Sequence, residues 1–407
     1  MPSQRIFYGW FVVAACFAVT ATLGEALFSF GVFFKPLEEE FGWSRSMVSS
    51  GYTVFLAGYA VSAALSGRLV DRYRPRLILI SSACLAGLGL SLGSQVNNID
   101  QLRFFSLIAG LGSGATLSLP TATVQRWFCY RRSAGTALAV VVSGLGVGQM
   151  GFTPLINHFV ISYGWRNAYL LTGILFFAII FISSLFIRQS PIEASGSPGK
   201  EGAQPPGIAG WGAAKAMTTL AYGGLIFSAC VALVAFQAVI VHIVPYATDI
   251  GMSSTAAAAA LGLLGGLTIP GRLTFGFISA KIGWQRGLAI SLFGMSVSLI
   301  WLLLCSNLSW VLYGFVILFG SFYGIRSVTQ WGILSEFFGM RSLGALIGIT
   351  SAISTMVSAG APYLAGYIFD TTGSYFVAFV VLAVLSFGGG LVVLLLKKPR
   401  TTQNEPG

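Results

Sequence analysis

The stretch GRLVDRYRPR, residues 67–76, decides the fold of this chain, because it separates two long apolar runs and returns in the second half of the sequence. The related stretch is GFISAK at residues 276–281. A second pair of stretches has the same separation along the chain and shares four positions: Phe128, Arg132, Ser133 and Gly135 correspond to Phe337, Arg341, Ser342 and Gly344. Gly164 likewise corresponds to Gly373. Independent matches at one separation predict two duplicated halves.

The composition places these halves in a membrane. Of the 407 residues, 55% are hydrophobic and only 9% are charged, and the mean hydropathy is +0.82. A water-soluble fold of this length would have too little polar surface. Apolar runs of roughly 20 residues, the length that crosses a bilayer as a helix, recur from end to end. The sequence therefore predicts an all-α integral membrane protein.

The apolar runs predict twelve transmembrane helices. The first run is too long for the core of a signal peptide and lacks a small-residue cleavage site, so it counts as a span. The predicted spans are 8–33, 46–69, 76–95, 102–124, 134–156, 167–187, 217–244, 255–279, 287–306, 310–334, 343–368 and 375–396.

The basic residues predict the orientation. The even-numbered loops and both termini collect most of them, whereas the opposite loops hold only Lys35, Arg45, Arg103 and Arg166. By the positive-inside rule, both termini are expected in the cytoplasm. The net charge of +11 is thereby explained by topology, and since no basic domain forms, no nucleic-acid partner is expected.

A polar stretch divides the predicted helices into six and six. Between residues 189 and 212 the apolar pattern gives way to Pro, Gly, Ser, Glu and Lys, the composition of a flexible tether. The expected organisation is an N-terminal six-helix bundle at 1–188, a cytoplasmic linker at 189–215 and a C-terminal six-helix bundle at 216–407.

Three motifs carry a family resemblance over essentially the whole chain. Residues 67–76 resemble the signature between helices 2 and 3 of the major facilitator superfamily, with Arg74 where that pattern normally has glycine. The stretches FYGW at 7–10 and RWFCYRRSAG at 126–135 resemble the two signatures of the monocarboxylate transporter family. The resemblance implies the major facilitator fold and a bacterial lactate/pyruvate:proton symporter. The oxalate:formate antiporters share much of the pattern and remain an alternative.

Arg272 is the clearest candidate for substrate binding. A charge deep in the membrane costs at least about 2.5–3.5 kcal/mol, so an ionisable group there is a functional candidate. A guanidinium offers a planar fork to a carboxylate, and the neighbouring Pro270 and Gly271 suggest irregular backbone that lines a cavity. By resemblance, Arg272 matches the substrate arginine of the monocarboxylate family. The alternative is an arginine that extends to the inner membrane surface.

Four further residues complete the predicted substrate site. Arg326 is a second anion contact or the partner of a buried carboxylate, and Tyr323 lies one turn from it on the same helix face. Tyr375, at the outer start of the last helix, is a hydroxyl donor or an interfacial anchor. Phe28 stands, by resemblance, where the animal carriers have a lysine in helix 1.

Glu25, His242 and Asp249 are the candidate groups for proton coupling. A carboxylate that meets an arginine and water in turn can load and release a proton. Other roles remain open: a salt bridge for Glu25, a place near the surface for His242, and a cap on the next helix for Asp249. Thr268 stands where the animal carriers have an aspartate, so proton coupling here rests on family membership.

The charged loop residues have a different predicted role. A cytoplasmic latch that holds the two halves together is expected from Arg68, Asp71, Arg72, Arg74, Arg76 and Arg132. The stretch GLGSG at 110–114 lacks the Gly-Lys-Ser/Thr ending of a phosphate-binding loop and lies inside a span. We see no nucleophile–base pair and no metal-ligand spacing, so neither an enzyme nor a cofactor is expected.

The expected function is therefore alternating-access transport of a small monocarboxylate such as lactate or pyruvate together with a proton. Two other functions stay open, an oxalate/formate-type antiporter and a carboxylate sensor that does not transport. The expected partners are the substrate, the proton and membrane lipid, without an accessory subunit, and the expected location is a bacterial plasma membrane.

Overall fold

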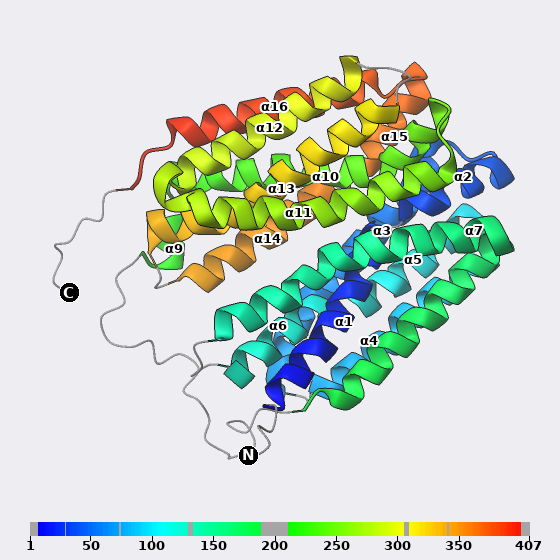
Figure 1. Ribbon diagram of the computed structural model, residues 1–407, viewed down its shortest axis with the longest axis horizontal. Helices are drawn as coiled ribbons and strands as arrows, with labels where there is room; N and C mark the ends of the chain where they lie inside the picture. The colour runs from blue at the N-terminus through cyan, green and yellow to red at the C-terminus, as the bar shows by residue number, and fades with distance from the viewer. Residues whose placement is uncertain are drawn as a thin grey trace, which may run out of the picture. The chain divides into compact units, whose positions relative to one another are not determined.

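The computed structural model describes residues 7–28, 30–72, 75–128, 133–188, 211–304, 309–339 and 342–399. Almost all of these residues lie in helices, which confirms the all-α prediction (Figure 1). The helices of the first half are α1 Gly9–Phe28, α2 Phe30–Phe41, α3 Arg45–Arg72, α4 Pro75–Leu92, α5 Ile99–Ser113, α6 Ala115–Phe128 and α7 Ala134–Phe186, with a 3-10 turn η1 at Gly93–Gln95. Those of the second half are α9 Ala213–Met217, α10 Leu220–Asp249, α11 Ser254–Ile282, α12 Trp284–Leu304, α13 Ser309–Phe338, α14 Leu343–Ala359, α15 Ala361–Thr372 and α16 Phe376–Leu395.

Ten helical stretches of the described chain are long and apolar enough to cross a membrane. Two of the predicted spans are broken in the structure, the fourth into α5 and α6 at Gly114 and the eleventh into α14 and α15 at Gly360. The first predicted span lies in α1 and α2, on either side of Ser29, which is outside the described residues. The first predicted span is represented by the shorter apolar helix Gly9–Gly24, and the fifth and sixth lie together in the 51-residue stretch within α7. The helix positions thus agree with the twelve predicted spans.

Helix α7 reverses direction at Gly164, where φ is 78° and ψ is 157°. Only glycine adopts this left-handed region without strain, so the helix breaks there. The part of α7 after Gly164 runs back from the turn in the opposite direction (Figure 1). Gly373, the residue that corresponds to Gly164 in the second half, has a φ of 69° between α15 and α16. Gly42 and Gly251, at the same separation, have φ values of 62° and 90°. The repeated backbone angles support the duplication inferred from the sequence.

The chain divides into two compact units. The first comprises Met1–Glu201, Ile240–Gly266 and Pro362–Asp370, and the second comprises Gly202–Val239, Leu267–Ala361 and Thr371–Gly407. The first unit therefore contains α1–α7 together with the end of α10, the first part of α11 and most of α15. The predicted bundle boundaries stay a prediction, and most of the predicted linker lies outside the described residues.

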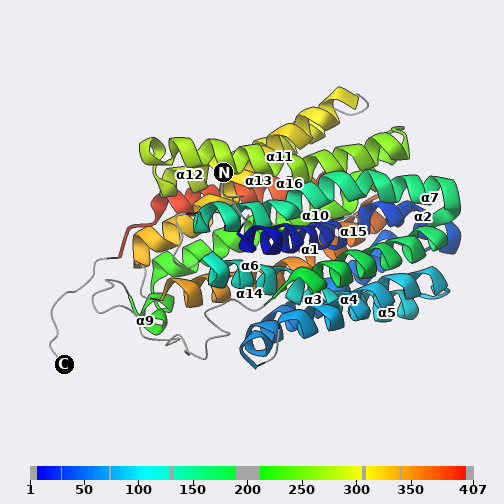
Figure 2. The same cartoon turned by 60° about the horizontal axis from the view of Figure 1, so that its bottom comes forward.

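Glycines let the helices of the first unit pack closely. A Cβ atom on Gly148 of α7 would collide with the backbone of Ala21 in α1, and one on Gly110 of α5 with the backbone of Phe55 in α3. Small residues at such crossings let helix backbones approach within a membrane. Figure 2 shows α3, α4 and α5 along one side of this unit. Gly110, in the glycine-rich stretch at 110–114, thus serves helix packing.

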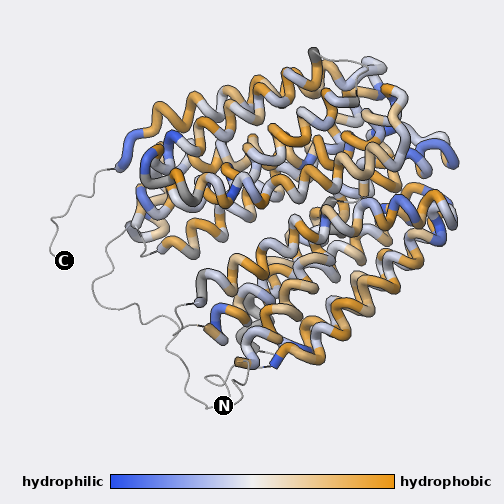
Figure 3. Tube along the Cα trace, viewed as in Figure 1, coloured by the Kyte–Doolittle hydropathy of each residue, from blue (hydrophilic) through white to orange (hydrophobic). Residues whose placement is uncertain are grey.

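The surface hydropathy agrees with a membrane environment. Hydrophobic residues run along the lengths of the helices, and hydrophilic residues gather near helix ends (Figure 3). Large apolar side chains are exposed on these helices, among them Leu220, Met356 and Leu395, which are 89%, 77% and 79% exposed. Exposed apolar surface of this extent is expected where a helix faces lipid.

The reversal of α7 is fixed by a polar cluster at the end of the first unit that the sequence predicts to be extracellular, called here the outer end. The indole Nε1 of Trp165 donates to Glu40 over 2.5 Å, and Arg166 Nη2 donates to the same carboxylate over 2.6 Å. Arg166 Nη1 also donates to the carbonyl oxygens of Ser94 and Val96. The hydrogen bond from Trp165, more than the charge of Arg166, holds the pKa of Glu40 below its ordinary value.

Candidate functional site

Three of the five predicted substrate residues, Arg272, Tyr323 and Arg326, lie in the second unit where α11 crosses α13. A Cβ atom on Gly271 of α11 would overlap the carbonyl oxygen of Ser321, and one on Gly324 of α13 would overlap that of Thr268. The two glycines therefore permit a helix crossing too close for any larger residue. Because Arg272 directly follows Gly271, this crossing brings its side chain to the surface of α13.

Arg272 is half-buried and bonds to a neutral partner. Its Nε donates to Ser327 Oγ over 2.9 Å, and that hydroxyl donates in turn to the carbonyl oxygen of Gly324 over 2.7 Å. Every ion pair found in the described part of the chain belongs to the first unit. Arg272 therefore has no carboxylate partner among the described residues. Ser327 thus orients the guanidinium while its charge stays available to an anion.

Tyr323 lies near both Arg272 and Arg326. Its ring stacks on Phe236 of α10, with the centroids 3.6 Å apart and the planes 1° from parallel. The Cζ atom of Arg326 lies 5.8 Å from the centroid of this ring, and both Arg326 and Arg272 lie within electrostatic reach of its phenol. The stack fixes the ring, so the hydroxyl has a defined position for a substrate oxygen.

Arg326 is the more deeply buried of the two arginines, at 6% exposure. Its Nη2 donates to the carbonyl oxygen of Ala229 over 3.2 Å, and its Cζ lies 5.8 Å from the centroid of the Tyr323 ring. Its Nε is buried without a hydrogen-bond partner. One alternative from the sequence was that Arg326 pairs with a buried carboxylate. In the structure Arg326 forms no ion pair with any described acidic residue.

The second unit is nearly devoid of negative charge. Of the 12 acidic residues in the chain, Glu336 is the one that the described part of this unit contains. It lies ten residues along α13 from Arg326, roughly 15 Å at the rise of an α-helix. Two buried cations without a carboxylate are costly to keep, and such groups within a membrane mark substrate or ion sites. The arrangement can bind an anion.

Two other predicted substrate residues are not placed in this group. Tyr375 is buried at the start of α16, where its ring stacks on Phe379 at 5.6 Å between centroids. Phe28 ends α1, and its side chain lies outside the described residues.

At the outer end of the first unit, Asp249 is held by two cations. Lys35 Nζ lies 2.5 Å from its Oδ1, and Arg45 Nη2 lies 2.6 Å from its Oδ2. Glu38 is also within 3.3 Å of Lys35 and 3.0 Å of Arg45. We call Lys35, Glu38, Arg45, Asp249 and Asp370 the outer cluster. It ties the end of α10 to α2 and α3.

Asp370 connects α15 to the outer cluster. Its carboxylate oxygens accept hydrogen bonds from the backbone N–H groups of Arg45 and Ser46 over 2.8 and 2.9 Å. A carboxylate at a helix N-terminus is stabilised by the unpaired N–H groups and the helix dipole. The ring of Phe369 lies 3.7 Å from Cζ of Arg45, and Gly366 leaves room for the Arg45 backbone.

His242 is fully buried, although the sequence suggested a position near the surface. Its Nε2 lies 2.7 Å from the carbonyl oxygen of Pro362 and 3.3 Å from Ser49 Oγ, and its ring packs edge-on against Phe34. The hypothesis that Asp249 caps the next helix is not supported, because Ser253 Oγ accepts from the N–H of Ala256 at the start of α11. Glu25 lies in α1, and its side chain is outside the described residues.

The predicted cytoplasmic latch falls mostly outside the described residues. Arg74 and Arg132 are not described, and the side chains of Arg68, Asp71 and Arg72 are not described either. Arg76 is exposed near the start of α4. The latch therefore stays a prediction.

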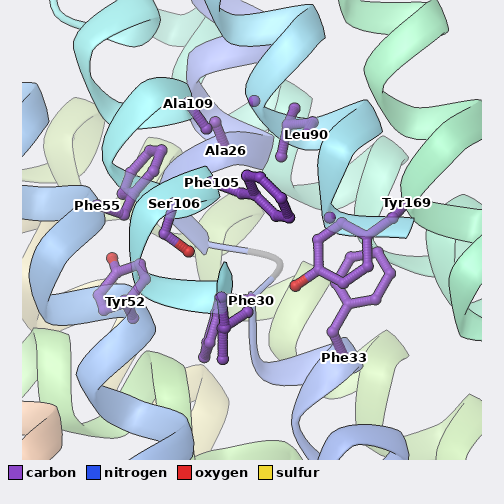
Figure 4. Close-up of a pocket in the computed structure, with 13 residues that line it drawn as sticks. Ala26, Phe30, Phe33, Tyr52, Phe55, Leu90, Phe105, Ser106, Ala109 and Tyr169 are labelled. Atoms are coloured by element: carbon purple, nitrogen blue, oxygen red, sulfur yellow. The ribbon is translucent and has the colours of Figure 1, made fainter. Parts of the chain in front are cut away.

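An apolar pocket in the first unit differs in chemistry from the arginine site. Its walls carry aromatic rings from several helices (Figure 4), and none of its lining residues is charged. The lining residues with aromatic rings are Phe30, Phe33, Tyr52, Phe55, Phe105 and Tyr169. The hydroxyl of Tyr52 already donates to the carbonyl oxygen of Leu27 over 2.5 Å. This pocket offers no cation to a carboxylate.

Loss of the Asp249 charge is expected to loosen the outer cluster. Asp249→Asn removes the carboxylate through which Lys35 and Arg45 bind the end of α10 and leaves them paired with Glu38 of α2, so separation of α10 from α2 and α3 becomes easier. With the five native cysteines replaced by serine, Ser49→Cys, at a fully buried position beside His242, reports on opening through its rate of reaction with a membrane-impermeant maleimide. We expect Asp249→Asn to raise that rate by about tenfold, the effect of a change of about 1.4 kcal/mol.

The control for this experiment is Asp100→Asn, which removes an exposed ion pair with Arg103 at a different place in the first unit. It should leave the labelling rate unchanged. Equal rates in the Asp249→Asn protein and its parent would show that the outer cluster does not hold this end closed.

Comparison with protein families gives one matching family. The family model described as Major Facilitator Superfamily matches residues 10–362. Among characterised proteins, monocarboxylate transporter 13 of Rattus norvegicus is 27% identical over 404 residues, which cover 95% of this chain and 89% of that protein. Monocarboxylate transporter 4 of Rattus norvegicus is 26% identical over 416 residues, which cover 98% and 86%.

Solved structures show the same fold at lower identity. A D-xylose–proton symporter superposes with a TM-score of 0.74 at 14% identity, over 96% of this chain and 98% of that chain. A nucleoside transporter superposes with a TM-score of 0.73 at 11% identity, over 96% and 100%.

Proposed function

The chain belongs to the Major Facilitator Superfamily, and from this premise we propose that it is a proton-coupled secondary transporter of small monocarboxylates such as lactate and pyruvate. It is a multi-pass membrane protein distantly related to the monocarboxylate transporters. The observation that carries the proposal is the half-buried guanidinium of Arg272, which has a neutral hydrogen-bond partner and no carboxylate partner among the described residues.

In this proposal the substrate carboxylate accepts hydrogen bonds from Arg272, and the hydroxyl of Tyr323 assists. Arg272 supplies charge and a planar fork, and the low-dielectric surroundings strengthen the interaction relative to water. The two halves of the protein rock about the site, so that it is reached from each side of the membrane in turn. The outer cluster is the contact that separates when the outer side opens.

A co-transported proton neutralises the charge that crosses with the substrate. Glu25, His242 and Asp249 are the candidate acceptors. Asp249 is paired with Lys35 and Arg45 and becomes available to a proton once the outer cluster separates. His242 is buried beside the same cluster, so its hydrogen bond to Pro362 is broken by the same movement. We place the protein in a bacterial plasma membrane, where it acts without an accessory subunit.

Exchange of carboxylates is the second candidate function. The observation that favours it is Arg326, a second guanidinium without a carboxylate partner in the described chain. Two cations suit an antiporter that carries oxalate in one direction and formate in the other. Sequence resemblance to the monocarboxylate transporters ranks symport above exchange.

The test is uptake by purified protein in liposomes. With a proton gradient directed inward, we expect radiolabelled lactate to accumulate above its external concentration, and a protonophore to abolish the accumulation. Accumulation that needs internal formate and ignores the proton gradient would support exchange. Saturable lactate binding without any accumulation would support a non-transporting sensor and contradict both transport proposals.

A further inference from the structure

We propose that Arg326 is a second carboxylate contact, so that the site accepts short dicarboxylates, with one carboxylate on Arg272 and the other on Arg326. The inference rests on the proposed function, because it takes Arg272 as the anchor of a substrate carboxylate. It adds a substrate class and a residue that determines specificity.

The first step is the state of the Arg326 side chain. It is 94% buried, its Nη2 donates to the carbonyl oxygen of Ala229, and its Cζ lies 5.8 Å from the centroid of the Tyr323 ring, so both of these neighbours are uncharged. Its Nε is buried with no acceptor at all. A buried donor without a partner costs free energy, and a guanidinium costs more than a neutral group. A purely structural arginine would be expected to have these donors satisfied, so the open donor points to a missing acceptor.

The second step is that Arg326 and Arg272 share one neighbourhood. The Cζ atom of Arg326 lies 5.8 Å from the centroid of the Tyr323 ring, and both arginines are close enough to the Tyr323 phenol to interact with it electrostatically. Arg272 bonds to Ser327, the residue that follows Arg326 on α13. In our proposal a ligand with acceptor oxygens at both ends bridges the two guanidinium groups beside Tyr323.

The third step is the charge balance. The described part of the second unit contributes two guanidinium charges here, and its single acidic residue, Glu336, is about three helical turns from Arg326. A bound monocarboxylate neutralises one charge and leaves the other unpaired. A dianion neutralises both. In a low-dielectric site the difference favours the dianion, since an unpaired buried charge is the costly state.

The experiment measures binding of radiolabelled malonate and lactate to detergent-purified protein by scintillation proximity at about pH 7.5, where carboxylates are ionised. We expect malonate and succinate to displace bound lactate, and propionate to do so more weakly than malonate. In Arg326→Gln, malonate affinity should fall by at least about tenfold while lactate affinity changes by less than about threefold. Arg326→Lys should recover part of the malonate affinity, because it restores the charge without the fork.

The control is Arg103→Gln, at an exposed position in the first unit, which should change neither affinity. The proposal is overturned if malonate does not bind the unaltered protein, or if Arg326→Gln lowers malonate and lactate affinity equally. A different result would contradict the proposed transport function alone. In that case both ligands bind, and malonate binding requires Arg326, but neither ligand accumulates in liposomes.

Discussion

Replacing Arg272 by glutamine is expected to lower the initial rate of lactate uptake by about 100-fold. The glutamine keeps a hydrogen-bond donor near Ser327 but removes the charge that pairs with the substrate carboxylate. A charge-assisted interaction of about 2.7 kcal/mol corresponds to this factor. The measurement is the rate of radiolabelled lactate uptake into liposomes under an inward proton gradient, over a range of lactate concentrations.

Arg272→Lys keeps the charge but loses the planar fork. Its rate of lactate uptake should therefore lie between those of the unaltered protein and Arg272→Gln. Arg103→Gln removes an exposed arginine of the first unit and should transport normally. Size-exclusion profiles of all variants show whether each is folded. A folded Arg272→Gln protein with unaltered uptake would remove the guanidinium from the transport mechanism.

Replacing Gly324 by valine is expected to have the largest effect on stability. Its Cβ atom would overlap the carbonyl oxygen of Thr268 in α11, and a backbone atom cannot move aside as a flexible side chain can. Forced overpacking costs about 1–3 kcal/mol where side chains can adjust, so a larger loss is expected here. The helices α11 and α13 would have to separate, which also moves Arg272 away from Ser327 and Tyr323.

The measurement is the fraction of monodisperse protein that remains after heating in detergent, followed by size-exclusion chromatography. Gly348→Val is the matched control, since a Cβ atom at Gly348 of α14 meets nothing within 4 Å. It should keep the thermal stability of the unaltered protein. Similar stability of the two valine variants would show that α11 and α13 do not depend on a glycine crossing.

The helices could be predicted from the sequence because hydropathy is a local signal. Apolar runs of membrane length and the repeated stretches at 67–76 and 276–281 indicated the spans and their duplication. The reversal at Gly164 was expected as a loop between two spans, and a positive φ explains why glycine occupies it. The break between α14 and α15 was not expected, since the segment remains apolar across Gly360.

The arginine site was predicted in part. Arg272, Tyr323 and Arg326 were all chosen from the sequence; the structure places Arg272 against Ser327 and Arg326 near the ring of Tyr323, and their role in substrate binding stays a prediction. Ser327 was missed, although its position four residues after Tyr323 on one helix could have indicated it. Phe236, which stacks on Tyr323, lies on another helix, and no local pattern marks it.

The outer cluster was beyond sequence analysis. Asp249 was chosen for its possible proton, yet its partners Lys35 and Arg45 are more than 200 positions away. The hydrogen bonds from Arg45 to Asp370 span 325 positions, and those around His242 span more than 100. Contacts of this kind depend on how helices pack, which a single sequence does not encode locally.

Solute counterflow tests the central role of Arg272 most directly, because it needs the carrier cycle without any ion gradient. Liposomes loaded with unlabelled lactate are diluted into a trace of radiolabelled lactate at equal pH on both sides. The unaltered protein is expected to give a transient accumulation of label, and folded Arg272→Gln protein none. Equal transient accumulation by both proteins would contradict an account in which the substrate carboxylate is carried on this guanidinium.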